Sequence, residues 1–436
     1  MVDRQSRRTW LLQSTSAAVV ALLGSKIARA DEDAEAIVST GHSLKDPSTF
    51  DAVMETFFRE NQPLGASLAV GYRGKLVYAK GFGYADQART KPVEPESLFR
   101  IASISKSITA TAVMKLVDQQ KVTLDQPIMP LLKTPYLPDD VRQWVDPRLA
   151  TVTVRNCLQH TAGFDTPASG DPFAMSHQIK AKLGKSFPLS PEDLLQFAFT
   201  RPLDFAPGEK FSYSNVGYLM LGQMIEQVSG QPYDQFVKQE VLQPLGVEGM
   251  RLARTLPEDR ASGEVEYRDG QERTGRYVLA DEGPAKVPFP YGAERIENLA
   301  PVGGWLASAS DLVQFTSGLF FPAEEPLLSS QSMGAMFAPP KLNGKQSPPT
   351  AYYGCGWMVR PAKESLLPWT CWHNGSLSGV STLLVSRADG VTWAVLFNQD
   401  TAPDGQPLAS KIDPLLHAPA STVKGWPEGD LRSSKP

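Results

Sequence analysis

Apolar residues recur at three- and four-residue steps between positions 104 and 116, which predicts a buried amphipathic helix there. Two shorter apolar runs precede this helix, at 66–71 and 75–80, on either side of the turn-forming residues 72–74. Runs of this length around a glycine-containing turn are typical of a β-hairpin. The pattern therefore predicts a pair of strands followed by a helix.

The rest of the pattern divides into a helical middle and a strand-rich end. From about 122 to 249 the spacing is mostly helical, with breaks at prolines and glycines, and residues 251–300 are polar and irregular, with one or two strands at most. A last helix is expected near 407–416. The strand-like runs before it lie at 357–359, 369–373, 382–385 and 393–397.

These elements indicate an α/β fold: an antiparallel sheet flanked by helices and completed by both ends of the chain, with an inserted, mostly helical lobe. The active site is expected between the two parts. We expect a single domain over 31–417, with its α/β part at about 50–105 and 290–417 and its helical lobe at about 106–290. The proline-bearing segment 418–436 is expected to be a flexible tail.

Composition narrows the function classes. The chain has 436 residues, of which 42% are hydrophobic and 21% charged, and a formal net charge of −4 without a basic block. Such a chain has ample material for a core and is a poor partner for nucleic acid. Its five histidines are scattered outside the spacings that bind metals, so we expect no metal site and no cofactor.

The N-terminus has the features of an export signal. The pair Arg7-Arg8 leads into a mildly apolar run at 17–23 and then into Ala28-Arg29-Ala30, a small-x-small cleavage site. We therefore expect residues 1–30 to be a twin-arginine signal peptide and the mature protein to be periplasmic. The apolar run is too short to span a bilayer, although an uncleaved membrane anchor remains the alternative.

The three cysteines are compatible with the predicted export. Cys157 falls within a predicted helix and is interpreted as a small core residue. Cys355 and Cys371 flank a connection between two strand-like runs, so the two could pair after export. The odd count and the reducing cytoplasm leave the disulfide an open question.

Candidate chemistry begins at the start of the predicted helix. Ser103 lies at its N-terminus and Lys106 one turn along on the same side. A helix N-terminus favours a developing alkoxide, and a desolvated lysine can accept the serine's proton, which makes the two residues a candidate nucleophile and base. The alternative is an N-cap serine beside a surface lysine. A second Ser-x-x-Lys at 421–424 is set aside because no helix follows it.

Two further segments carry candidate site residues: Tyr213, Asn215, His373, Gly375 and Ser376. A phenol near a lysine ammonium is biased toward phenolate and could pass a proton to a leaving group, and the Asn215 amide could hold a substrate carbonyl while bonding the lysine. Gly375 would let a substrate approach a strand edge, and the Ser376 N–H could point into the site. The alternatives are a buried tyrosine, an N-cap asparagine and a packed core histidine.

In this order, these residues resemble the serine β-lactamase and penicillin-binding-protein superfamily, especially its class C-like hydrolases and D-peptidases. The Ser-x-x-Lys signature matches Ser103–Lys106, the Tyr-x-Asn element matches Tyr213–Asn215, and the Lys/His-x-Gly strand matches His373–Gly375. The resemblance implies a single β-lactamase-like catalytic domain that forms an acyl-enzyme on Ser103. Its expected partner is a small-molecule or short-peptide acyl substrate.

The resemblance assigns the remaining roles as well. Tyr213 would protonate the leaving group, the backbone N–H groups of Ser103 and Ser376 would hold the oxyanion, and Asn215 and His373 would orient the substrate. His160, in a family-like Leu-x-His-Thr-Ala-Gly segment, is interpreted as a satisfied loop histidine rather than a ligand.

One departure bears on the substrate. Class C β-lactamases have lysine in the third motif, where this chain has His373. A histidine is mostly neutral at pH 7 and provides no fixed cation for a substrate carboxylate. The resemblance therefore favours an esterase or D-peptidase, with a β-lactamase proper or a non-catalytic penicillin-binding or sensor protein as alternatives.

The export signal can be tested directly. Changing Arg7 and Arg8 to lysine should leave precursor in the cytoplasm, because the twin-arginine route requires the pair. Cell fractionation with N-terminal sequencing of the wild type should find a mature chain that begins at or near Asp31. Normal export of the double variant would refute the twin-arginine assignment.

Overall fold

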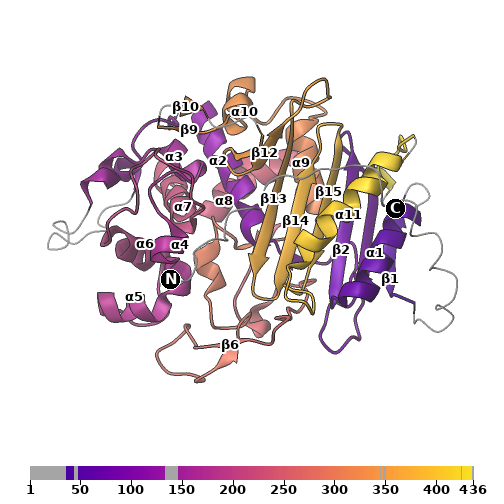
Figure 1. Ribbon diagram of the computed structural model, residues 1–436, viewed down its shortest axis with the longest axis horizontal. Helices are drawn as coiled ribbons and strands as arrows, with labels where there is room; N and C mark the ends of the chain where they lie inside the picture. The colour runs from indigo at the N-terminus through magenta and orange to yellow at the C-terminus, as the bar shows by residue number, and fades with distance from the viewer. Residues whose placement is uncertain are drawn as a thin grey trace, which may run out of the picture. The chain divides into compact units, whose positions relative to one another are not determined.

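An eight-stranded antiparallel sheet organises the chain in the computed structural model (Figure 1). The structure describes residues 36–43, 48–132, 146–343, 345–346, 350–423 and 425–434, so the expected signal peptide lies outside the described residues. Val38–Pro436 form one compact unit, which contains the whole sheet and every helix that packs on it. The strands, in their order across the sheet, are β1 (Ser39–Ser43), β3 (Lys75–Gly83), β2 (Gly65–Tyr72), β15 (Val391–Phe397), β14 (Val380–Ser386), β13 (Trp369–Leu377), β12 (Met358–Pro361) and β11 (Tyr352–Tyr353).

Helices cover both faces of this sheet, which explains why its central strands are apolar throughout. Every residue of β14 and β15 is buried. On one face, α1 (Ser48–Asn61) and α11 (Leu408–Thr422) pack against β15, where Trp393 lies 4.8 Å from His417 and Phe397 lies 5.5 Å from Phe57, measured between ring centroids. On the other face lies α9 (Ala309–Phe320), so close that a Cβ at Gly71 would approach Val313 to 2.7 Å.

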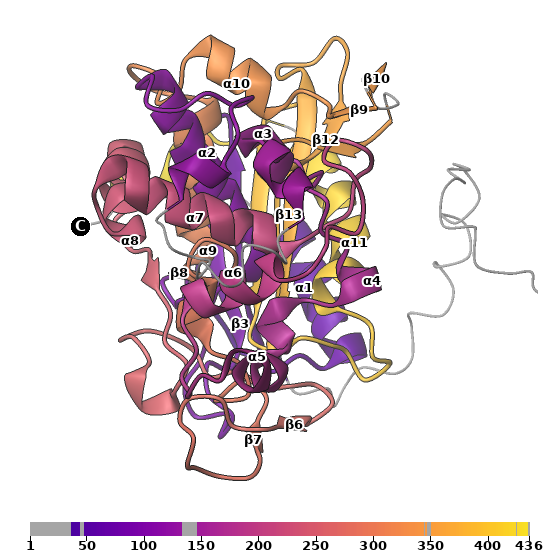
Figure 2. The same cartoon turned by 90° about the vertical axis from the view of Figure 1, so that its left-hand side faces the viewer.

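The helical lobe lies beside β13, and Figure 2 looks onto the lobe with the strands behind it. Its helices begin and end at ordinary signals: Ser190 and Asp193 form a capping box at the start of α6, and Gly184 and Gly230 end α5 and α7 in the left-handed region. The lobe's helices are α2 (Ser105–Asp118), α3 (Val154–Leu158), α4 (Thr166–Ser169), α5 (Ser176–Leu183), α6 (Pro191–Phe199), α7 (Asn215–Ser229) and α8 (Tyr233–Val237).

Short strands connect the two parts. A three-stranded sheet joins β4 (Phe99–Arg100), β8 (Trp305–Ala307) and β5 (Arg251–Leu252), and its central strand is β8. The remaining elements are the pair β6 (Thr274–Gly275) and β7 (Val287–Pro288), the pair β9 (Lys341–Leu342) and β10 (Lys345–Gln346), and the helix α10 (Ser330–Met336).

The α/β fold with an antiparallel sheet and a helical lobe is confirmed, as are the β2–β3 hairpin and the helix α2. Three details differ from expectation. The helix α9 was not anticipated, and α11 runs to Thr422, past the expected end of the domain at 417. The described residues 425–434 contact the sheet, where a flexible tail was expected: Trp426 stacks on Tyr72 at 5.1 Å, and the Lys75 amine donates to the Glu428 carbonyl at 2.6 Å.

All three cysteines are free, buried thiols, so the Cys355–Cys371 disulfide is not formed in this structure. Across the part of the chain that the structure describes, no helix is long and apolar enough to cross a membrane.

Candidate active site

Ser103 lies in a tight turn between the three-stranded sheet and the helix α2. Residues Ala102–Ile104 form a 3-10 turn, which Ala102 enters with a φ of 47°, in the left-handed region that costs a residue with a Cβ on the order of 1 kcal/mol or more. The residue at the N-cap of α2 is Ile104, not Ser103. The N-cap interpretation of Ser103 is therefore not the arrangement that the structure shows.

Gly375 explains how β13 can lie against this turn. A Cβ on Gly375 would come within 2.4 Å of the Ile101 carbonyl oxygen and 2.9 Å of the Ala102 Cβ. The Thr382 hydroxyl, from the next strand, donates to the same Ile101 carbonyl at 3.0 Å. Gly375 thus makes room for the protein's own backbone at the Ser103 turn. That it also lets a substrate approach the strand edge stays a prediction.

Lys106 is fully buried, which excludes the surface-lysine interpretation. Its Nζ lies 3.0 Å from Ser103 Oγ and donates to the Val302 carbonyl at 2.8 Å. It also lies 5.0 Å from the centroid of the Tyr213 ring. Burial lowers the pKa of Lys106 to about 7, against the opposing charge of Asp171. A neutral amine in this position can accept the serine's proton.

Tyr213 is present as a phenol and not as the phenolate that the sequence suggested. Burial raises its pKa above the ordinary value, and the nearby Ser103 hydroxyl only partly opposes the rise. The expectation of a phenolate is corrected because desolvation outweighs the one group that lowers the pKa of Tyr213, and burial lowers the pKa of the neighbouring Lys106 amine as well. Among the described residues, the Tyr213 hydroxyl has no partner in direct hydrogen-bond geometry.

Asn215 is the first residue of α7, and its amide is committed to a carboxylate. Its Nδ2 donates to Asp171 Oδ2 at 2.6 Å, rather than serving the lysine as expected. Its Oδ1 is buried without a hydrogen-bond partner among the described residues, so one acceptor of this amide is unused.

Two acidic residues of the site were not found from the sequence. Burial raises the pKa of Asp171, and burial together with the charge of Asp171 raises the pKa of Glu294 to about 7, while Arg100 opposes the rise at Glu294. Both residues lie in irregular segments, where no spacing relates them to Tyr213 or Lys106. The only local signal was the Asp-Pro sequence at 171–172, which marks the start of a turn.

His373 is buried, and both of its ring nitrogens are occupied. Its Nδ1 lies 2.7 Å from the Asn374 carbonyl, which can only accept, so Nδ1 carries the proton. Its Nε2 then accepts from the Tyr353 hydroxyl at 2.8 Å. Burial and the charge of Lys106 lower the pKa of His373 to about 3. The expected role of His373 as a hydrogen-bond donor to substrate is corrected, because it has no free N–H to offer.

Ser376 lies on β13 beside Gly375, opposite Ser381 of β14, and its side chain is exposed. The structure thus brings Ser103, Lys106 and Tyr213 together with Asn215 and places the strand of His373, Gly375 and Ser376 alongside the Ser103 turn.

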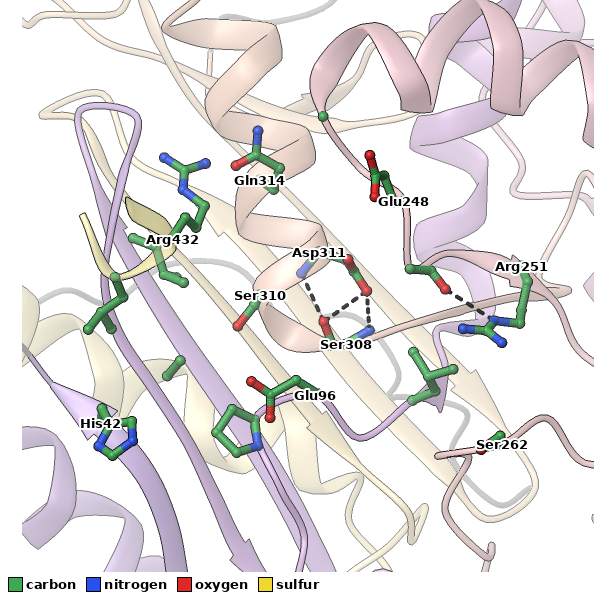
Figure 3. A pocket seen from close by; sticks show the side chains of 17 residues that line it. His42, Glu96, Glu248, Arg251, Ser262, Ser308, Ser310, Asp311, Gln314 and Arg432 are labelled. Carbon is green, nitrogen blue, oxygen red and sulfur yellow. Dashed lines mark hydrogen bonds between the residues drawn. The ribbon is translucent and has the colours of Figure 1, made fainter. Parts of the chain in front are cut away.

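A cavity of about 680 Å³ lies elsewhere, between the edge of the large sheet and α9 (Figure 3). Its polar residues include Glu96, Glu248 and Asp311, the last of which accepts from the Ser308 hydroxyl at 2.8 Å. No candidate catalytic residue lines it. Within the described ranges, no cluster of three or more His, Cys, Asp or Glu residues could hold a metal ion.

Comparison with known proteins is consistent with this geometry. The model of the Beta-lactamase family matches residues 50–416, which is most of the chain. The chain belongs to the Beta-lactamase family.

The relatives of this chain carry different names. The chain is 33% identical to "Esterase EstB" of Burkholderia gladioli over 257 residues, 58% of this chain and 61% of EstB. It is 27% identical to "Penicillin-binding protein 4*" of Bacillus subtilis over 345 residues, 77% of this chain and 68% of that protein. The octameric penicillin-binding protein homologue from Pyrococcus abyssi has a TM-score of 0.61 at 26% identity, covering 86% of this chain and 78% of that one.

Replacing the buried amine with an apolar side chain should stabilise the protein at neutral pH. Keeping a lysine neutral near pH 7, when it titrates at about 10.4 in the unfolded chain, costs on the order of 4 kcal/mol. We expect Lys106→Met to have a higher Tm than the wild type at pH 7 in scanning calorimetry. Because the folded-state pKa is depressed, the wild type gains stability as the pH rises from about 7 to about 10, so the advantage of the variant should shrink over that range.

A control comes from Lys121, an exposed residue just beyond α2. Lys121→Met should show no pH-dependent gain. A Tm for Lys106→Met that lies below the wild type at pH 7 would mean that the amine is not held neutral by burial.

Proposed function

We propose that this chain is an exported, periplasmic serine hydrolase that cleaves ester or amide bonds, including those of D-amino-acid peptides, through an acyl-enzyme on Ser103. The observation that carries the proposal is the buried Lys106 amine, 3.0 Å from Ser103 Oγ with a pKa lowered to about 7. If Ser103 were only a structural N-cap, a buried lysine beside it would destabilise the fold without serving a purpose, whereas a nucleophile requires a neighbouring base.

The geometry supports a proton path through groups that start out neutral. As Ser103 Oγ attacks the substrate carbonyl carbon, its proton passes to Lys106 Nζ, which becomes an ammonium. The Tyr213 phenol gives its proton to the leaving group as the bond to the carbonyl carbon breaks, and the ammonium then returns a proton to Tyr213. Water hydrolyses the ester on Ser103 by the reverse roles and regenerates the hydroxyl. No cofactor takes part in these steps.

The oxyanion would be held by the backbone N–H groups of Ser103 and Ser376, which lie on the turn and on the neighbouring strand. Asn215 Oδ1 would accept from a substrate N–H, as an amide or peptide substrate provides. The relatives named as an esterase and as penicillin-binding proteins support acyl substrates in general without selecting one.

Covalent labelling tests the proposal. A fluorophosphonate should add its mass to the peptide that contains Ser103, located by mass spectrometry of the digested protein. Ser103→Ala should abolish the adduct, and Lys106→Arg should slow labelling by on the order of a hundredfold or more, because arginine cannot act as a base. A folded wild type that stays unlabelled, and turns over no ester, would favour the non-catalytic binding protein instead.

The same site predicts a preference among substrates. Esters such as p-nitrophenyl butyrate should be hydrolysed with a kcat/KM far above that for the cephalosporin nitrocefin. The reason is that His373 is neutral, with a pKa lowered to about 3, and so provides no cation opposite a β-lactam carboxylate. Nitrocefin turnover that rivals a good ester would show that this chain is a β-lactamase proper.

A further inference from the structure

His160 holds the backbone on both sides of Tyr213. Its carbonyl oxygen accepts from the Ser212 N–H at 2.9 Å, and its Nδ1 accepts from the Ser214 N–H at 3.3 Å. The residues immediately before and after Tyr213 are therefore both tied to one residue, 53 positions earlier in the chain. No other residue makes this pair of contacts among those described.

The His160 ring also forms one side of the space that Tyr213 occupies. Its centroid lies 4.2 Å from that of Tyr213 and 4.5 Å from that of Tyr353, and only 2% of the residue is exposed. Its backbone has a φ of 55°, so the left-handed region is needed to place ring and carbonyl as they are. Such a conformation persists only where the surrounding contacts impose it.

The protonation state of this ring follows from its contacts. Since Nδ1 accepts an N–H, the proton of the neutral ring is on Nε2, and Nε2 has no hydrogen-bond partner among the described residues. Burial and the charge of Lys106 hold the pKa of His160 well below its usual range. The expectation of a satisfied loop histidine is thus only half right: one nitrogen is bonded, and the other is an unpaired buried donor.

The position of Tyr213 depends on contacts from other segments of the chain. Its hydroxyl has no described partner in direct hydrogen-bond geometry, and only the Ser103 hydroxyl lies near enough to lower its pKa by hydrogen bonding, so it must be kept beside Ser103 to act on a leaving group. It precedes the first turn of α7, in a stretch without regular structure, so neither a helix nor a strand fixes its backbone. Its position is therefore set by the two bonds to His160 and by ring packing.

We propose that His160 is a positioning residue, which holds the Tyr213 phenol where it can protonate the leaving group. The inference rests on the proposed function, because it assigns His160 a part in that acyl transfer. His160 itself touches neither the nucleophile nor the base in the described contacts; it acts through Tyr213.

The decisive measurement compares two esters of the same acid, p-nitrophenyl butyrate and ethyl butyrate. The p-nitrophenolate group leaves without a proton, whereas ethoxide needs one, so only the second ester depends strongly on Tyr213. Because kcat/KM covers the steps up to acylation, its ratio between the two esters reports leaving-group protonation. General loss of folded protein lowers both values equally and leaves the ratio unchanged.

Two substitutions of nearly equal size distinguish the effect of the Nδ1 hydrogen-bond acceptor from the effect of side-chain packing. His160→Asn places a carbonyl oxygen where Nδ1 lies and tolerates a positive φ. His160→Leu fills similar space without an acceptor. We expect His160→Leu to lower kcat/KM for ethyl butyrate by on the order of a hundredfold more than for p-nitrophenyl butyrate, as for a displaced general acid. His160→Asn should keep the wild-type ratio within about threefold, a small energy on the scale of one lost hydrogen bond.

Equal losses on both esters in His160→Leu would overturn the inference, and so would a folded His160→Asn whose ratio falls like that of the leucine variant. The second outcome keeps the test decisive if His160→Leu does not fold. Failure of the proposed function itself appears differently: the wild type would then hydrolyse neither ester and take no label on Ser103.

Discussion

The burial of one amine is the constraint on which the site depends. Lys106 has no exposed surface, and its pKa is lowered to about 7, which represents on the order of 4 kcal/mol against the folded state. The fold imposes this burial because α2 is covered on all sides, with every residue from Ser105 to Met114 buried. The Val302 carbonyl accepts a hydrogen bond from the amine. The neighbouring Gly303 lies against Ala102, so the segment that holds the amine also packs against the nucleophile turn.

A second constraint is the space available at the turn itself. Ser103 can face Lys106 only because Ala102 adopts a left-handed conformation and because β13 carries glycine at 375, where any side chain would collide with the Ile101 carbonyl. The sheet contributes the strand, the helical lobe contributes Tyr213 and Asn215, and the turn joins them. The site therefore exists only when both parts of the domain are folded together, since neither part contains all of its groups.

Sequence reasoning succeeded where the signal is local. The hairpin β2–β3, the helix α2 and the central strands β14 and β15 follow from apolar spacing, and the Ser103–Lys106 pair follows from one helical turn. It failed where a property depends on contacts between distant segments. The proton on Tyr213 depends on burial, and the tautomer of His373 depends on Tyr353 and the Asn374 carbonyl. Asp171 contacts Asn215 across a separation of 44 positions that includes the helices α5 and α6. No periodicity in the sequence records these contacts.

Asp171 places a negative charge near the buried groups of the site. Lys106, Tyr213, His373 and His160 are all driven toward their neutral forms by burial, so these four side chains carry little charge before reaction. In the proposed mechanism Lys106 takes the proton of Ser103, which would create a cation in this low-dielectric space, where it would be costly without a partner. Asp171 is the charge that already opposes the lowering of the pKa of Lys106. The Asn215 amide donates a hydrogen bond to Asp171, which holds the Asp171 carboxylate at the start of α7. Asn215 is in turn two residues from Tyr213 in the chain. In the proposed acylation, the carboxylate would therefore stabilise the Lys106 ammonium more than the neutral amine that precedes it, and this difference would lower the barrier.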